Sequence, residues 1–141
     1  MPSSTATYDR ESRRISSSSY ELSLGSHGEL VGLRVGPQIG ARHEMLDPDA
    51  ATDLWRIRYA DGQVAFSGNL PEPALTWHGD SSTLTLAYEG ADLEVEVRLV
   101  CDATSIAMSA RVENRSARIV KYVFLPHALR FSTRGLRRFL F

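Results

Sequence analysis

The sequence predicts an all-β protein, built as an antiparallel β-sandwich. Alternating apolar and polar residues fill most of the stretch from Leu84 to Leu125, and the clearest run, LEVEVRL at residues 93–99, is typical of a strand with one buried face. Short turn-forming segments rich in Gly, Asp and Ser separate such runs. Together they predict about nine short strands and almost no helix, which is the pattern of a sandwich.

The alternation also predicts strand register. A turn of even length at residues 102–105 keeps the apolar residues of both flanking strands on one face, because side chains alternate with a period of two. The apolar pairs expected across it are Cys101 with Ile106, Leu99 with Met108, Val97 with Ala110 and Val95 with Val112. On the other face Glu96 lies opposite Arg111, a favourable charge pair. The same rule places the preceding turn at residues 89–92, with Tyr88 opposite Leu93.

Upstream, the folded domain is expected to begin at Tyr20. Alternating or apolar runs predict strands at residues 20–24, 29–35, 54–59, 63–66 and 74–77. Glycine-containing turns are expected at residues 25–28 and at Asp61-Gly62, which is a strong hairpin signal. The pattern is lost between Gly36 and Asp53, where residues 41–46 can form one helical turn. Residues 119–125 are apolar on both faces and predict a central or doubly covered strand.

Composition bounds the class of protein. The 141 residues are 43% hydrophobic with a net charge of −1, as in an ordinary globular chain with a single core. This balance argues against a nucleic-acid partner or an acidic membrane surface. Eight basic residues and one acidic residue follow Ala110, and they are interpreted as a solvated face with a basic tail. The lone Cys101 is expected to be a small buried hydrophobe.

Residues 1–19 are rich in serine, threonine and arginine, and they predict a disordered leader. They lack the apolar centre of a signal peptide, and no segment has the 18 or so apolar residues of a membrane span, so cytoplasmic residence is expected. The sandwich domain is expected over residues 20–131. A basic and apolar tail at residues 132–141 follows it and is expected to start a missing region.

Candidate chemical residues are few. The four histidines, His27, His43, His78 and His127, are too widely spaced in sequence to indicate a metal site, and no cofactor motif occurs. Glu94 and Glu96 resemble a catalytic carboxylate pair, but their regular alternation favours a solvated strand face. Indole rings can stack on sugars, so Trp77 with the neighbouring His78 and Asp80 is the candidate substrate-binding group. Trp55 is expected in the core.

A family resemblance rests on two passages. The strings HGELVGLR at residues 27–34 and LWRI at 54–57 resemble the opening of galactose-mutarotase-like β-supersandwich domains. The strings ARVENRS at 110–116 and VFLPH at 123–127 are similar to a passage in the N-terminal supersandwich domains that precede a TIM-barrel glycoside hydrolase. The resemblance covers residues 20–131 and implies an incomplete, supersandwich-like domain. It assigns no catalytic residue to this chain.

Three functions remain open. The resemblance implies a noncatalytic module of a carbohydrate-active enzyme of glycoside hydrolase type, supporting a catalytic domain and contacting sugar. The chain can instead be part of an aldose 1-epimerase-like enzyme, or a protein-interaction sandwich with no sugar role. In each case the chain alone is expected to be catalytically inactive. Its apolar tail predicts contact with a missing catalytic domain or self-association.

Overall fold

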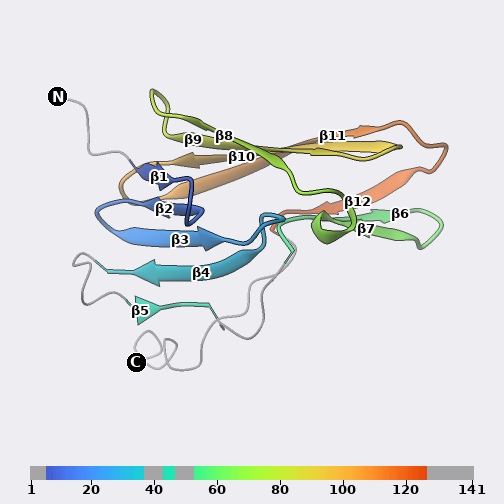
Figure 1. The fold of residues 1–141 in the computed structure, drawn as a ribbon. Helices are drawn as coiled ribbons and strands as arrows, with labels where there is room; N and C mark the ends of the chain where they lie inside the picture. Colours follow the sequence, from blue (N-terminus) through green and yellow to red (C-terminus); the bar gives the residue numbers. More distant parts are fainter. Residues whose placement is uncertain (1–5, 37–42, 47–52, 127–141) are drawn as a thin grey trace, which may run out of the picture.

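The computed structural model describes residues 6–36, 43–46 and 53–126 as an antiparallel β-sandwich (Figure 1). In this part of the chain, no helix has the length and apolar character needed to cross a membrane. One short 3-10 helix, η2, spans Ser67–Asn69. The strands are β1 Thr7–Asp9, β2 Arg14–Ser16, β3 Tyr20–Leu24, β4 Leu30–Val35, β5 His43–Glu44, β6 Arg56–Tyr59, β7 Val64–Phe66, β8 Ala74–His78, β9 Thr83–Glu89, β10 Leu93–Cys101, β11 Ile106–Asn114 and β12 Val120–Phe124.

The strands form three sheets. A five-stranded sheet has the order β1-β2-β3-β4-β5, a four-stranded sheet β11-β10-β9-β8, and a three-stranded sheet β12-β6-β7. In Figure 1 the four-stranded sheet runs along one side of the molecule, and the other two sheets lie next to each other against it. One core cluster draws on all three sheets through Leu22, Ile57 and Val97, which are buried.

The register predicted for β10 and β11 is confirmed. Cys101 pairs with Ile106, Leu99 with Met108, Val97 with Ala110, Val95 with Val112, and Glu96 with Arg111. The odd-numbered residues of β10 are all buried, as an apolar face packed on the core requires. The partners on β11 are half-buried or exposed, since β11 is the edge strand of its sheet.

The register predicted for β9 and β10 is shifted by two residues. Tyr88 lies opposite Val95 and not opposite Leu93. Gly90 donates its N–H to the carbonyl of Leu93 at 2.8 Å, so the chain reverses within a tighter turn than the predicted four residues. A shift of two keeps every side chain on its predicted face, because the period of a strand is two. The predicted buried faces of β9 and β10 are therefore correct although the turn between them was predicted wrongly.

The domain begins earlier than predicted. Residues 7–9 and 14–16 are strands of the five-stranded sheet, not a disordered leader, whereas residues 1–5 lie outside the described part. Ile15 is fully buried opposite Leu22 of β3. The serines that follow build the turn between β2 and β3: the Ser17 hydroxyl accepts from the Ser19 N–H at 3.0 Å and donates to the Ala103 carbonyl at 3.0 Å.

Two local predictions between β4 and β7 have different outcomes. The expected helical turn over residues 41–46 is wrong where it can be seen, because residues 43–44 form strand β5 against β4; residues 41 and 42 lie outside the described part. The Asp61-Gly62 hairpin is confirmed. Gly62 has φ of 89°, the left-handed region that glycine adopts most easily, and the Tyr59 N–H donates to the Gln63 carbonyl at 2.9 Å to close the turn.

Strand β12 differs most from its prediction. It is the edge strand of the three-stranded sheet, paired only with β6 among the described strands, and not a central or doubly covered strand. Its large side chains are exposed, Tyr122 by 49% and Phe124 by 40%. The apolar residues on both faces therefore do not reflect burial on both faces.

Two tyrosines hold the layers together. The Tyr88 hydroxyl of β9 donates to the His27 carbonyl in the β3–β4 turn at 2.7 Å. The Tyr20 hydroxyl of β3 donates to the Asp102 carbonyl in the β10–β11 turn at 2.7 Å. The first contact needs Gly28, whose φ is 82° and where a Cβ atom would collide with the Tyr88 hydroxyl. These hydrogen bonds link the five-stranded and four-stranded sheets at both ends.

Candidate functional site

The structure does not bring the predicted sugar-binding residues together. Trp77 and His78 are consecutive in β8 and so project from opposite faces of the sheet. Trp77 is half-buried, and Tyr8 of β1 stacks on it with ring centroids 5.8 Å apart and planes at 28°. His78 is exposed on the outer face, and Asp80 is exposed in the β8–β9 turn. The stacked Tyr8 occupies one face of the indole that a sugar would need.

The other tryptophan belongs to the core, as expected. Trp55 has no exposed surface and meets Tyr88 edge to face, with ring centroids 5.4 Å apart. This geometry is favourable for two aromatic rings and joins the three-stranded sheet to the four-stranded one. Trp55 is therefore not a surface on which a ligand can stack.

Glu94 and Glu96 are held by arginines on the outer face of β10. Arg115 Nη2 lies 2.8 Å from Glu94 Oε1, and Arg98 Nε lies 3.1 Å from Glu96 Oε1. Both ion pairs are partly solvent-exposed, with Arg98 two residues along β10 from Glu96 and Arg115 just after the end of β11. This arrangement agrees with a solvated face rather than with a carboxylate pair set apart for acid–base chemistry.

The histidines lie far apart in the fold. His27 is in the β3–β4 turn, His43 in β5 and His78 at the end of β8, while His127 is outside the described residues. Within residues 6–36, 43–46 and 53–126, no group of three or more His, Cys, Asp or Glu side chains is placed to hold a metal ion.

An apolar cleft of about 310 Å³ lies between β3, β4 and β11. Leu22, Leu33, Ile106 and Met108 line it, and the Tyr20 ring forms part of its wall. The adjoining polar groups are not activated, because burial raises the pKa of the Tyr20 hydroxyl and raises that of the Cys101 thiol to about 11. At neutral pH the Tyr20 hydroxyl and the Cys101 thiol therefore keep their protons, and the described lining of the cleft is mainly apolar packing surface.

A different surface combines exposure with aromatic side chains. Tyr122 and Phe124 project from the same face of β12, with ring centroids 6.0 Å apart and planes at 39°. The strand ladder places Tyr122 opposite Arg58 and Phe124 opposite Arg56, and it continues from Arg56 to Phe66 of β7. Ile57 and Tyr59 point the other way into the core, so this is the outer face of the sheet. We call these residues, Arg56, Arg58, Phe66, Tyr122 and Phe124, the aromatic face.

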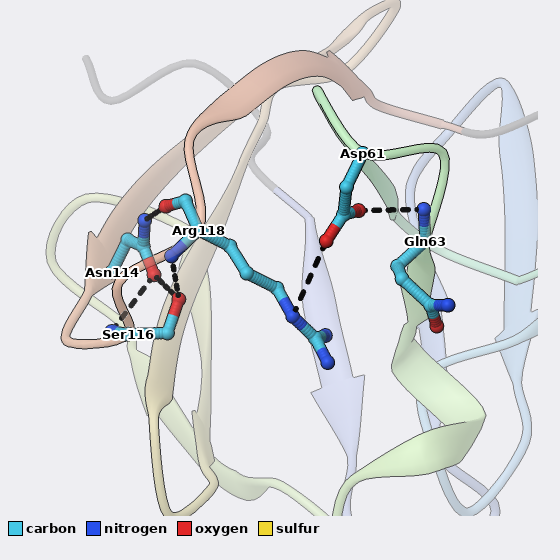
Figure 2. A network of polar contacts seen from close by, with 5 residues as sticks. All are labelled: Asp61, Gln63, Asn114, Ser116 and Arg118. Atoms are coloured by element: carbon cyan, nitrogen blue, oxygen red, sulfur yellow. Dashed lines mark hydrogen bonds and ion pairs between the residues drawn. The ribbon is translucent and has the colours of Figure 1, made fainter.

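A polar network in the β11–β12 loop fixes the start of β12 (Figure 2). The Asn114 side chain donates to the Arg118 carbonyl at 2.6 Å and accepts from the Ser116 N–H at 3.1 Å. Arg118 Nε then lies 3.7 Å from Asp61 Oδ2 in the β6–β7 turn. Asn114 and Ser116, which carry part of the family resemblance, thus shape a loop and position the edge strand beside β6.

Sequence reasoning missed the aromatic face. Its signal is present in the run VKYVF at residues 120–124, where Val120, Tyr122 and Phe124 alternate with Lys121 and Val123. No family model matches this chain, and no curated protein or solved structure gives a match either.

Proposed function

We propose that this chain is a noncatalytic β-sandwich module of a carbohydrate-active enzyme of glycoside hydrolase type, which supports a catalytic domain and contacts sugar. The observation that carries the proposal is the exposed pair of rings on β12, Tyr122 and Phe124, only 6.0 Å apart. Aromatic rings with an apolar body are the side chains on which the apolar face of a sugar ring can lie. The resemblance of residues 110–116 and 123–127 to hydrolase supersandwich domains supports the same assignment.

The supporting role has its own structural argument. Ile119 is 72% exposed just before β12, and Val123 is 44% exposed on the other face of the strand. Exposed apolar groups gathered at one sheet edge mark surfaces that meet another polypeptide. This edge is where we place the contact with the catalytic domain.

Sugar binding by the intact chain tests the proposal. Isothermal titration with a panel of neutral oligosaccharides is expected to find at least one ligand, whose Kd rises about tenfold or more in Tyr122→Ala. Tyr122→Phe, which keeps the ring, should bind as the unchanged chain does. Val100→Ala, on the outer face of the four-stranded sheet, is the matched control and should have no effect.

Enzyme assays complete the test. Aldose mutarotation and hydrolysis of aryl glycosides should proceed at background rates with the purified chain. Turnover that is lost on changing His27 or His78 would overturn the noncatalytic assignment. Failure of every sugar to bind, together with specific capture of another protein through β12, would favour the interaction sandwich instead.

A further inference from the structure

The aromatic face contains two arginines in unequal situations. Arg56 is engaged: its guanidinium lies 5.4 Å from the centre of the Phe66 ring and 3.5 Å from an Asp53 carboxylate oxygen. Arg58, two residues further along β6, is exposed beside Tyr122. Among the described residues no carboxylate forms an ion pair with Arg58. The face therefore presents one uncompensated guanidinium next to an exposed ring.

A second cation lies at the same ring. Lys121 Nζ is 5.5 Å from the centre of the Tyr122 ring. The β-bulge between Val120 and Tyr122 places the extra residue Lys121 in the edge strand. Lys121 thus lies over one face of the Tyr122 ring, and Arg58 is the cross-strand neighbour of Tyr122 on β6. A ligand seated on the other face of this ring would lie close to both cations.

Resting on the proposed function, we infer that the aromatic face binds an acidic carbohydrate, namely an oligosaccharide containing uronic acid. A sugar ring would lie on Tyr122, and its carboxylate would accept hydrogen bonds from the Arg58 guanidinium. Arginine suits this role because its planar donors match the two oxygens of a carboxylate. Lys121 adds a less directional charge.

A single-stranded nucleic acid is the competing occupant, because it also stacks on rings and carries negative charge. The observations favour the sugar. Binding to a phosphate backbone draws on a series of cations that track the strand, and the whole chain carries a net charge of −1. On the aromatic face Arg56 is already paired with Asp53, and Arg118, just before β12, is paired with Asp61. Among the described residues of the aromatic face and its edge strand, Arg58 and Lys121 are the cations left for a polyphosphate.

The experiment compares matched ligands that differ only in charge. Trimers of galacturonic, glucuronic and mannuronic acid are titrated against the intact chain, each beside its carboxyl-reduced neutral counterpart. We expect one acidic trimer to bind about tenfold or more tightly than its neutral counterpart, and added NaCl to reduce that advantage.

Substitutions test whether Arg58 is responsible for the preference for the acidic trimer. Arg58→Gln is expected to remove the preference for the acidic trimer while leaving the affinity for the neutral one within about twofold. Arg58→Lys should retain part of the preference, since it keeps the charge and loses the fork geometry. Arg98→Gln, an exposed arginine on the other sheet, is the control and should change neither affinity. Thermal unfolding monitors that each variant is folded.

The outcomes separate the two proposals. Equal binding of acidic and neutral trimers, or an acidic preference that survives Arg58→Gln, would overturn this inference, while neutral binding lost in Tyr122→Ala would leave the sugar-binding module standing. Binding of no sugar by the unchanged chain would overturn both. Tighter binding of an oligothymidine, weakened by Arg58→Gln, would assign the face to nucleic acid.

Discussion

The outer faces of the four-stranded and three-stranded sheets make a sharp contrast. On the first, the ladder aligns three glutamates across neighbouring strands, Glu89, Glu94 and Glu113. Arg115 reaches two of them, at 2.8 Å to Glu94 and 3.4 Å to Glu113. On the second, Tyr122 and Arg58 stand next to each other in solvent, and no described carboxylate pairs with Arg58.

The two faces differ in whether their charged side chains are paired within the protein. A row of like charges on adjacent strands is unfavourable unless a cation lies within reach, and the loop residue Arg115 supplies it. The Arg115 pKa is raised by its two glutamates, Glu113 first and then Glu94. Among the described residues no carboxylate compensates Arg58 on the aromatic face, and this difference is why we assign the ligand there.

The largest expected effect tests whether the two sheets differ only on their outer faces. Val97→Asp in β10 and Ile57→Asp in β6 each place a charge in a fully buried site, and each should lower the free energy of unfolding by about 4 kcal/mol or more. The controls Val100→Asp and Val64→Asp, at sites 46% and 42% exposed, should cost about 1 kcal/mol or less. Urea denaturation measures all four. Equal losses within a pair would show that its inner and outer faces are misassigned.

An intermediate effect concerns the core that both sheets share. Burial raises the pKa of the Cys101 thiol from 9.0 to about 11 and also raises the pKa values of Tyr20 and Tyr88. The unfolded chain then loses these protons at lower pH than the folded one, so stability is full below pH 9 and falls as the pH rises through about 9 to 11. We expect Cys101 to contribute about 1–3 kcal/mol to this fall.

Urea denaturation at a series of pH values between 7 and 11 measures this loss. Cys101→Ala removes the thiol, and its unfolding free energy should depend less steeply on pH over that interval than that of the unchanged chain. Identical slopes for the two proteins would contradict a raised thiol pKa. The substitution changes the interior and leaves the side chains of both outer faces in place.

The smallest effect returns to the outer faces themselves. Glu96 and Arg98 form an exposed pair 3.1 Å apart, and a double-mutant cycle with Glu96→Gln and Arg98→Gln should give a coupling of about 0.2–1 kcal/mol that salt reduces. Arg58→Gln should change stability by less than about 0.5 kcal/mol, because it breaks no ion pair of the described residues. A larger loss in Arg58→Gln would mean that Arg58 has a structural partner, and the contrast between the faces would fail.

Local alternation was sufficient to predict much of the four-stranded sheet. The run at residues 93–101 determined which side chains of β10 are buried, and its parity determined the pairing with β11. The register between β9 and β10 differs from the prediction by two residues, because several turns near Gly90 preserve the same face. The surroundings of the predicted sugar-binding group depend on a long-range contact instead. Trp77 is selected by its residue type and its sequence neighbours, but Tyr8, distant in sequence, stacks on it.

What the sequence by itself determined is the all-β class, the inward faces of β9 and β10 and the hairpin at Asp61-Gly62, since these depend on a period of two and on local backbone preferences. Only the tertiary structure decided that residues 7–9 and 14–16 are strands, because the burial of Ile15 depends on contacts with β3 and on the layer beyond it. Only it decided, too, that Tyr122 and Phe124 are exposed. An apolar pattern on both sides of a strand records which side chains are present, whereas their burial depends on which other layers cover them.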